Sequence, residues 1–263
     1  MRNIDKLKST LIETADQSLF NRIADHYAQK DLIASTRLAR GTIIRRAMKP
    51  LIESGASLGT LVDVGCGIGA QAAYLAGHYD RYIGVDYSER LVEIGRELFF
   101  ETENAEFITA NIKDAALPKS IADTVLVVTA LHHMTDLKIV MEAMARIAKP
   151  GGNFVAIEPQ RGNPVVQAMR RVRMKTDRNY SADQHFFSFD EIIEMMNLIP
   201  MDNIRVEYQG FLTPPFGQVG TTPQMIFYPL SRLACALENA AELVCFGPLG
   251  KLSWNIVAYG KFS

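Results

Sequence analysis

The sequence predicts an α/β protein built on a doubly wound, mainly parallel sheet. From residue 60 onward, short apolar runs alternate with helical patterns, as is typical of parallel strands joined by crossover helices. A glycine-rich loop, GCGIG, follows the first apolar run, and an acidic residue closes the second. In such sheets the loop after the first strand borders a ligand site, so we expect one at the carboxyl ends of these strands.

The expected elements follow from apolar spacing and from capping residues. Helices are predicted over 11–27, 32–52 and 164–175, and one of about ten residues follows the glycine loop. Another begins after an N-cap at Ser88, and the next runs from Thr135 or Asp136 to KPGG at 149–152. A last helix begins at a capping box of Ser188 and Glu191. Strands are predicted over 60–64, 82–86, 105–110, 123–130, 154–159, 204–211 and 254–262. The last two are expected to pair as an antiparallel end of the sheet.

Composition excludes several classes of protein. The chain has 263 residues, is 48% hydrophobic and 22% charged, and carries a formal net charge of −1, so no nucleic-acid partner is expected. Cys66, Cys235 and Cys245 are an odd number without C-x-x-C spacing, which argues against a disulfide framework and a zinc site. We therefore expect no metal and a reducing, cytoplasmic location.

Membrane insertion is not expected either. The start of the chain, MRNIDKLKST, lacks the apolar core of a secretory signal. The most apolar long segment, 224–246, contains Arg232, Glu238 and Glu242, and charges at these depths are costly in hydrocarbon. The sequence thus predicts no membrane span and leaves peripheral contact with lipid open.

The glycine loop has the properties of a site for an adenosyl ligand. Gly65 suits a tight turn, Gly67 lets the backbone approach a ligand, and Gly69 lets the helix start pack against the first strand. Asp86 follows Gly69 by seventeen residues, where its carboxylate can bind both ribose hydroxyls. The G-x-G-x-G spacing differs from the pyrophosphate-binding G-x-G-x-x-G, and Asp63 before the loop suits a ligand's ammonium group better than a pyrophosphate.

Five segments together resemble a known family. The segments are VDVGCGIGA, GVDYSERLVEIGRE, ITANIKDAALP, DTVLVVTALHHM and ARIAKPGGNFVAIEP. They are similar, in order and at normal spacing, to the motifs of class I S-adenosylmethionine (SAM)-dependent methyltransferases with a small-molecule, type 11-like domain. The resemblance covers roughly residues 60–160. It implies a Rossmann-like sheet of seven strands whose last strand is antiparallel, SAM as cofactor, and S-adenosylhomocysteine (SAH) as product.

The resemblance also implies cofactor-binding residues. Asp63, Gly65, Cys66 and Gly67 lie around the methionine half and Thr129 beside it, with Gly69 in the same loop. Asp86 binds the ribose, Tyr87 packs on the adenine face, and Asn111 and Ile112 meet the adenine edge. Tyr27 and Arg40 of an N-terminal cap are expected as further contacts. The family often has Asp where Asn111 stands. The Asn111 carbonyl can still accept a hydrogen bond from the adenine amino group, so binding is expected to survive.

Two adjacent histidines are the candidates for catalysis. Methyl transfer from a sulfonium mainly needs alignment, and a general base is required only for a protonated acceptor. His133 and His132 follow the fourth expected strand, near the reacting methyl, although a purely structural role at a helix start remains open. His185 is a second candidate. The basic run from Arg170 to Arg178 either holds an acidic group on the acceptor or forms a solvated helix face.

The expected organisation is an N-terminal helical cap, 1–56, followed by a SAM-binding domain, 57–263, with substrate-side helical insertions at about 160–188 and 212–253. The second insertion is apolar and suits either a greasy acceptor pocket or a homodimer interface. The acceptor is expected to be a small hydrophobic molecule, such as a lipid, isoprenoid-linked or polyketide-like compound. A nicotinamide-dependent oxidoreductase and a non-catalytic SAM-binding module remain alternatives.

Overall fold

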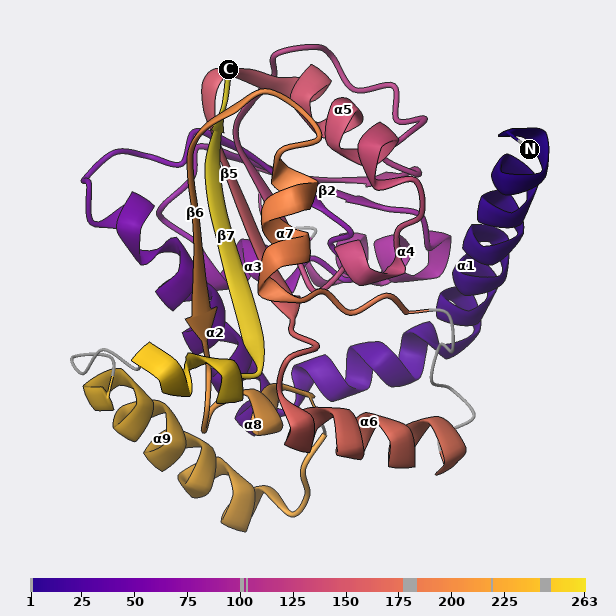
Figure 1. The fold of residues 1–263 in the computed structure, drawn as a ribbon. Coiled ribbons are helices and arrows are strands. Elements are labelled where there is room, and N and C mark those ends of the chain that lie inside the picture. Colours follow the sequence, from indigo (N-terminus) through magenta and orange to yellow (C-terminus); the bar gives the residue numbers. More distant parts are fainter. Residues whose placement is uncertain (1, 100–101, 103, 177–183, 219, 242–246) are drawn as a thin grey trace.

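The described residues form a seven-stranded sheet at the centre of the computed structural model (Figure 1). The structure describes the chain apart from residues 1, 100–101, 103, 177–183, 219 and 242–246. The strands are β1 Thr60–Val64, β2 Arg81–Asp86, β3 Ala105–Thr109, β4 Ala122–Val128, β5 Ala148–Pro159, β6 Met201–Gln209 and β7 Asn255–Phe262. They lie in the order β3-β2-β1-β4-β5-β7-β6, and only β7 is antiparallel to its two neighbours. The predicted fold class is confirmed.

Helices connect the strands and cover both faces of the sheet (Figure 1). The α-helices are α1 Arg2–Leu32, α2 Ala34–Ile52, α3 Ala70–Tyr74, α4 Glu89–Leu98, α5 Leu137–Ile147, α6 Pro164–Thr176, α7 Phe189–Met196, α8 Pro214–Gln218 and α9 Gln224–Ala241. Two 3-10 helices are η1 Leu131–His133 and η2 Gly247–Leu252. None of the helices in the described parts of the chain combines the length and the apolar character that crossing a membrane needs.

Two apolar clusters hold the sheet between its helices. Because side chains alternate along a strand, Val62 and Val64 of β1 face a cluster that includes Met144 of α5, while Leu61 faces a cluster that includes Met48 of α2. All five side chains are fully or almost fully buried. Helices α5 and α7 therefore cover one face of the sheet, and α2, α3 and α4 cover the other.

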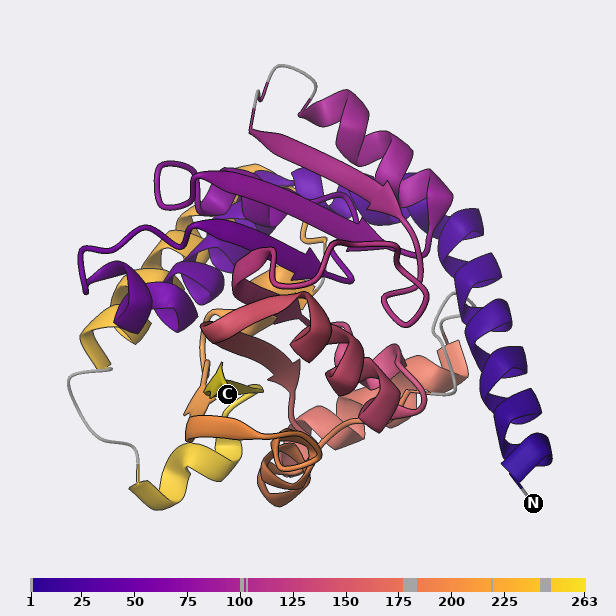
Figure 2. The same ribbon diagram turned by 90° about the horizontal axis from the view of Figure 1, so that it is seen from above.

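Helix α1 stands apart from these layers. Figures 1 and 2 show it along one side of the molecule, with its N-terminal end projecting beyond the sheet. Its second half packs on α4, where Ala24 and Ala28 join Leu91 and Ile94 in a third, smaller apolar cluster. This position brings the middle of α1 to the carboxyl ends of the parallel strands.

Several local predictions are confirmed. The Ser88 hydroxyl accepts a hydrogen bond from the Leu91 amide and caps α4. Ser188 and Glu191 form the predicted capping box at the start of α7. The two late strands pair with each other as an antiparallel end of the sheet.

Three details differ from the sequence-based expectation. Helix α3 stops at Tyr74, because the chain turns through Gly77, whose φ is +83°, to enter β2. Helix α5 ends at Ile147 rather than at the KPGG segment, which lies in β5 where the pairing with β4 shifts register. Asp136 occupies the N-cap position of α5 without a side-chain cap, since its φ is +53° and its carboxylate lies near Lys113 instead.

Candidate active site

The loop between β1 and α3 exposes bare backbone at its centre. Gly65, Gly67 and Gly69 all have a positive φ, at +72°, +57° and +71°, a conformation that favours glycine. A Cβ atom added to Gly67 would meet nothing within 4 Å, so open space lies in front of this peptide. A Cβ on Gly69 would lie 2.1 Å from the ring of Phe107, so the helix start packs closely against β3.

Asp86 ends β2 beside this loop. Its Oδ2 accepts a hydrogen bond from the Gly67 amide at 2.8 Å, and its Oδ1 accepts one from the Ser88 amide at 2.8 Å. Burial raises the pKa of Asp86, against the two backbone N–H groups, which lower it. The carboxylate is thus held in place by backbone donors and keeps further lone pairs for a ligand.

One cavity of about 800 Å³ runs from the glycine loop to the substrate-side helices. Of the predicted site residues, those that line it are Tyr27, Gly65, Cys66, Gly67, Asp86, Tyr87, Asn111, Ile112, Thr129, His132 and His133. Asp63, Gly69 and His185 do not line it. The structure therefore brings together segments that are more than a hundred residues apart in sequence.

Asp63 lies behind the cavity wall and is fully buried. Its Oδ2 accepts a hydrogen bond from the Tyr82 hydroxyl at 2.5 Å, while its Oδ1 has no hydrogen-bond partner among the described residues. Burial raises the pKa of Asp63 to about 7, the Tyr82 hydrogen bond opposes this, and the nearby Asp86 charge adds to it. Asp63 therefore contacts Tyr82 of β2 and does not line the cavity.

Cys66 also lines the cavity, but its thiol stays protonated. Burial raises the pKa of its thiol well above the ordinary value, and the charges of Asp86 and Asp63 act in the same direction. The neutral thiol is the less nucleophilic form. Cys66 therefore lines the cavity with a thiol that is poorly suited to act as a nucleophile.

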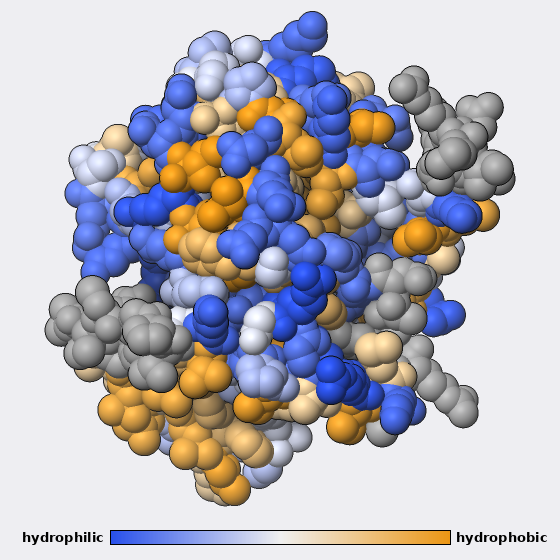
Figure 3. Space-filling model, viewed as in Figure 1, coloured by the Kyte–Doolittle hydropathy of each residue, from blue (hydrophilic) through white to orange (hydrophobic). Residues whose placement is uncertain are grey.

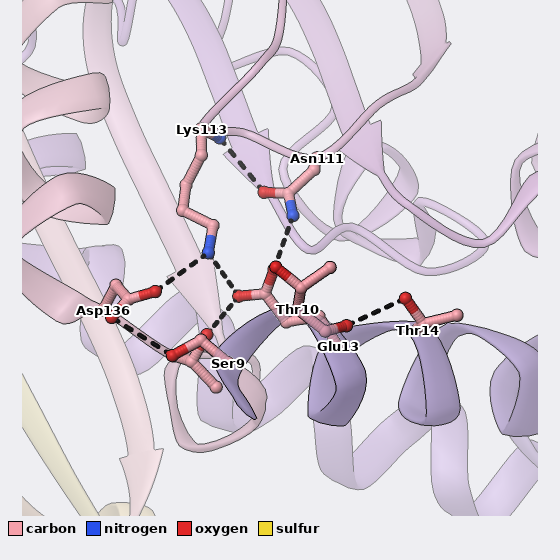
Figure 4. Close-up of polar contacts among 8 residues, drawn as sticks. Ser9, Thr10, Glu13, Thr14, Asn111, Lys113 and Asp136 are labelled. Carbon is pink, nitrogen blue, oxygen red and sulfur yellow. Dashed lines mark hydrogen bonds and ion pairs between the residues drawn. The ribbon is translucent and has the colours of Figure 1, made fainter. Parts of the chain in front are cut away.

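Glu13 of α1 fastens this helix over the strand ends (Figure 4). Its Oε2 accepts a hydrogen bond from Asn111 Nδ2 at 3.1 Å, and its Oε1 accepts hydrogen bonds from Lys113 Nζ and Thr135 Oγ1, each at 2.5 Å. Asn111 Oδ1 accepts a hydrogen bond from the Lys113 backbone amide at 3.1 Å, so the Asn111 side chain presents its nitrogen to α1. Glu13 was not predicted, because a single acid on a helix has no local signal for contacts a hundred residues away.

A second acid of α1 joins two predicted site residues. Asp16 Oδ2 accepts a hydrogen bond from the Tyr87 hydroxyl at 2.7 Å and lies 3.0 Å from His133 Nδ1. The ring of Phe20 meets the His133 ring edge to face, with 5.1 Å between centroids. Helix α1 thus holds Tyr87 and His133 from one side of the cavity.

Further along the cavity, Tyr27 belongs to a partly buried group of charged residues. Arg40 Nη1 forms an ion pair with Asp31 at 2.7 Å, and Arg40 Nη2 donates to the Tyr27 hydroxyl at 3.4 Å. Lys30 Nζ lies 4.0 Å from the centre of the Tyr27 ring. This end of the cavity therefore carries two cations and one carboxylate.

His132 follows β4, and its Nδ1 lies 2.7 Å from Oε2 of Glu158. Glu158, the last residue but one of β5, is 1% exposed. Its Oε1 accepts hydrogen bonds from the amides of Ala130 and Leu131, each at 2.8 Å. Burial lowers the pKa of His132, and the charge of His133 acts in the same direction. With Nδ1–H donated to Glu158, Nε2 of the neutral imidazole is left as a base.

The far wall of the cavity is largely apolar. It includes Val166, Met169, Phe186, Pro215 and Trp254. The guanidinium of Arg170 lies 3.6 Å from the centre of the Phe186 ring, and its Nη1 donates to the carbonyl of Gln160 at 2.8 Å. Arg170 therefore helps build this wall, whereas Arg178 of the same basic run lies outside the described residues.

Comparison with known proteins identifies the class of this domain. Residues 62–156 match the family described as methyltransferase domain, a stretch that runs from β1 into β5 and includes the glycine loop. The resemblance to class I SAM-dependent methyltransferases is thereby confirmed.

Curated relatives are similar over part of their length. A demethylmenaquinone methyltransferase of Tropheryma whipplei is 29% identical over 143 residues, which are 54% of this chain and 58% of that protein. One of Staphylococcus aureus is 28% identical over 136 residues, 50% of this chain and 55% of that protein. The matched part of the chain thus spans little more than half the length of these relatives.

Solved structures share the fold across most of the chain. A SAM-dependent methyltransferase from Thermotoga maritima has a TM-score of 0.65 at 18% identity and covers 94% of this chain and 100% of its own. Geranyl diphosphate C-methyltransferase from Streptomyces coelicolor, solved with Mg²⁺, geranyl diphosphate and SAH, has a TM-score of 0.58 at 14% identity and covers 83% of this chain and 77% of its own. At these identities the likeness concerns the fold.

Proposed function

We propose that this protein transfers a methyl group from SAM to a small hydrophobic acceptor. The observation that carries the proposal is a single cavity that joins the glycine loop of a methyltransferase domain to an apolar wall of substrate-side helices. The named activities of the relatives, on demethylmenaquinone and on geranyl diphosphate, support an isoprenoid-linked or otherwise hydrophobic acceptor.

The residues of the cavity fit SAM. Open space in front of Gly67 leaves room for a ligand against the peptide, and the buried Asp86 carboxylate beside it suits two ribose hydroxyls. Tyr87 presents a ring held by Asp16, and Asn111 supplies a polar group at the adenine end. When bound, the cofactor supplies a methyl group already activated on a positively charged sulfur.

The cationic end of the cavity suits the methionine carboxylate. Arg40 and Lys30 both lie against the Tyr27 ring, and Asp31 pairs with both of these cations. A carboxylate placed near this group would gain charge-assisted hydrogen bonds. We assign Arg40 and Tyr27 to cofactor binding on this basis.

His132 is the proposed general base, and Glu158 is the residue that positions it. The proton of the acceptor's hydroxyl or acidic carbon passes to His132 Nε2 while the bond from the acceptor to the methyl carbon forms and the bond from carbon to sulfur breaks. Glu158 holds the Nδ1–H, so the imidazole stays in the tautomer that can accept the proton. His133, which is turned toward Asp16, is the alternative for the same role.

Calorimetry tests the cofactor assignment first. SAH should bind and raise the melting temperature, whereas NAD(H) should do neither; the opposite result would favour an oxidoreductase. Incubation of the enzyme with a cell extract and SAM carrying a deuterated methyl group then tests turnover by mass spectrometry. Binding of SAH without any product that gains three deuterons would favour the non-catalytic alternative.

A further inference from the structure

Helix α9 buries two polar residues on its inner side and exposes several large apolar side chains on its outer side. On the inner side, Ser231 donates to the carbonyl of Ser35 at 3.0 Å. Glu238, which is 2% exposed, accepts hydrogen bonds from the amides of Phe211 and Thr213 and pairs with Arg46. These polar groups are satisfied within the protein, so they do not explain what covers the opposite side of the helix.

The outward side of α9 carries large apolar side chains. They are Met225, Ile226, Leu230, Leu233 and Leu237, each between 45% and 85% exposed. Figure 3 shows the corresponding field of apolar surface at the lower left of the molecule, where Figure 1 places α9. Contiguous exposed apolar surface of this kind marks an interaction site.

Helix α6 exposes further apolar side chains at the same end of the molecule. Figure 1 shows α6, α8 and α9 together on the lower side, beyond the end of the sheet. The apolar side chains of α6 that face outward are Val165, Met169, Val172 and Met174, which are 50% to 63% exposed. We call these nine side chains of α6 and α9 the α6–α9 face.

Charge on these two helices favours one kind of partner. Helix α6, PVVQAMRRVRMKT, has four basic residues and no acid, and the side chains of Arg171 and Lys175 are exposed. Helix α9 has the exposed Arg232, and its one acid, Glu238, is turned inward. Exposed apolar groups with a basic fringe are the pattern of a helix that lies in the interface of a membrane with anionic lipids.

We propose that the α6–α9 face docks on the surface of a membrane that contains anionic lipids. The apolar side chains would enter the boundary between headgroups and acyl chains, and Arg171, Lys175 and Arg232 would contact lipid phosphates. The docking of this face on a membrane does not depend on the proposed function. Its consequence for the acceptor rests on the proposed function: Met169 and Val172 belong both to this face and to the cavity wall, so an apolar acceptor can pass from the bilayer into the cavity.

Co-sedimentation with vesicles tests the docking surface. The full chain should pellet with vesicles of phosphatidylglycerol and phosphatidylcholine, and pellet less with phosphatidylcholine alone or at high salt. The double variant Ile226→Glu/Leu233→Glu should lose most of this binding, and Arg171→Gln/Lys175→Gln should weaken it roughly tenfold or more. Ile139→Glu, a matched change of an exposed apolar residue on α5 at the other end of the molecule, should bind as the unaltered protein does (Figure 1).

Two further measurements keep the result decisive. Each variant should retain its circular dichroism, its melting temperature and its affinity for SAH, since all the altered side chains are exposed. Absence of vesicle binding by the unaltered protein would overturn the proposal. So would a dimer in sedimentation velocity that the double variant breaks without any vesicle binding, because the face would then join two copies of the chain. SAH binding is measured separately, so failure of docking and failure of the proposed function are distinguishable.

Discussion

Nδ1 of His132 lies 2.7 Å from Oε2 of Glu158, and this pair joins the cavity wall to the end of β5. His132 lines the cavity, whereas Glu158 lies behind it and also binds the amides of Ala130 and Leu131. One buried carboxylate thus fixes both the loop after β4 and the tautomer of the histidine. The arrangement gives His132 and Glu158 separate, testable roles.

Replacing the proposed base should lower turnover without weakening cofactor binding. His132→Gln removes the imidazole Nε2, so kcat should fall about 10²- to 10⁴-fold on an acceptor that must lose a proton. Calorimetry should give an unchanged SAH affinity, because the Asp86 and Gly67 contacts are separate from the histidine. Full turnover by this variant would end the role of His132, and the same measurement on His133→Gln would then identify the alternative base.

The dependence of kcat on pH should follow the ionisation of the His132 imidazole. Burial lowers the pKa of His132 below its ordinary value of 6.5, so the unprotonated form persists to lower pH than in water. The acidic limb of kcat against pH should therefore lie below pH 6.5, and kcat should be flat between that limb and neutrality. The Glu158 charge raises the pKa of His132, so Glu158→Gln should move this limb to still lower pH. An acidic limb above pH 6.5 in the unaltered enzyme would contradict the assignment.

Two glycines of the loop should separate binding from stability. Gly67→Ala places a methyl group in open space at a positive φ, so it should cost only about 1–2 kcal/mol of the free energy of unfolding while weakening SAH binding. Gly69→Ala carries the same backbone strain and also a contact of 2.1 Å with the Phe107 ring, which should cost roughly 1–3 kcal/mol more. Urea unfolding and calorimetry measure the two effects. Equal losses of stability would refute the packing argument for Gly69.

The contrast between these glycines shows what could be predicted from sequence. The alternating strands, the cap at Ser88 and the glycine loop have local signals, because each depends on residues close together in the chain. The placement of Gly69 against Phe107 has none, since it depends on how β3 lies beside β2. Glu13 and Glu158 were missed for the same reason, as their partners lie far away in sequence. Long-range polar contacts are decided by topology, which spacing alone does not encode.

Removing the Asp86 carboxylate should weaken cofactor binding directly. Asp86→Ala deprives the ribose hydroxyls of their acceptor and leaves the amides of Gly67 and Ser88 without their partner. The affinity for SAH should fall by about 1–3 kcal/mol. Glu106→Ala, which removes a half-exposed acid from the neighbouring strand β3, is the matched control and should leave the affinity unchanged. Equal affinities for all three proteins would remove the ribose assignment.

Asp63 should make the stability of the ligand-free protein fall as pH rises. Burial raises its pKa in the folded state to about 7 from the ordinary value of 3.8, so between these values the folded protein binds more protons than the unfolded chain. The free energy of unfolding should therefore decrease with increasing pH by up to about 1.4 kcal/mol per unit across this window and level off above pH 7. Asp63→Asn keeps an acceptor for the Tyr82 hydroxyl and cannot ionise, so this part of the slope should vanish. Urea unfolding at pH 5, 6, 7 and 8 measures both proteins. Because burial also raises the pKa of Asp86, a smaller slope of the same sign should remain in the variant, and identical slopes in the two proteins would show that Asp63 is ionised throughout.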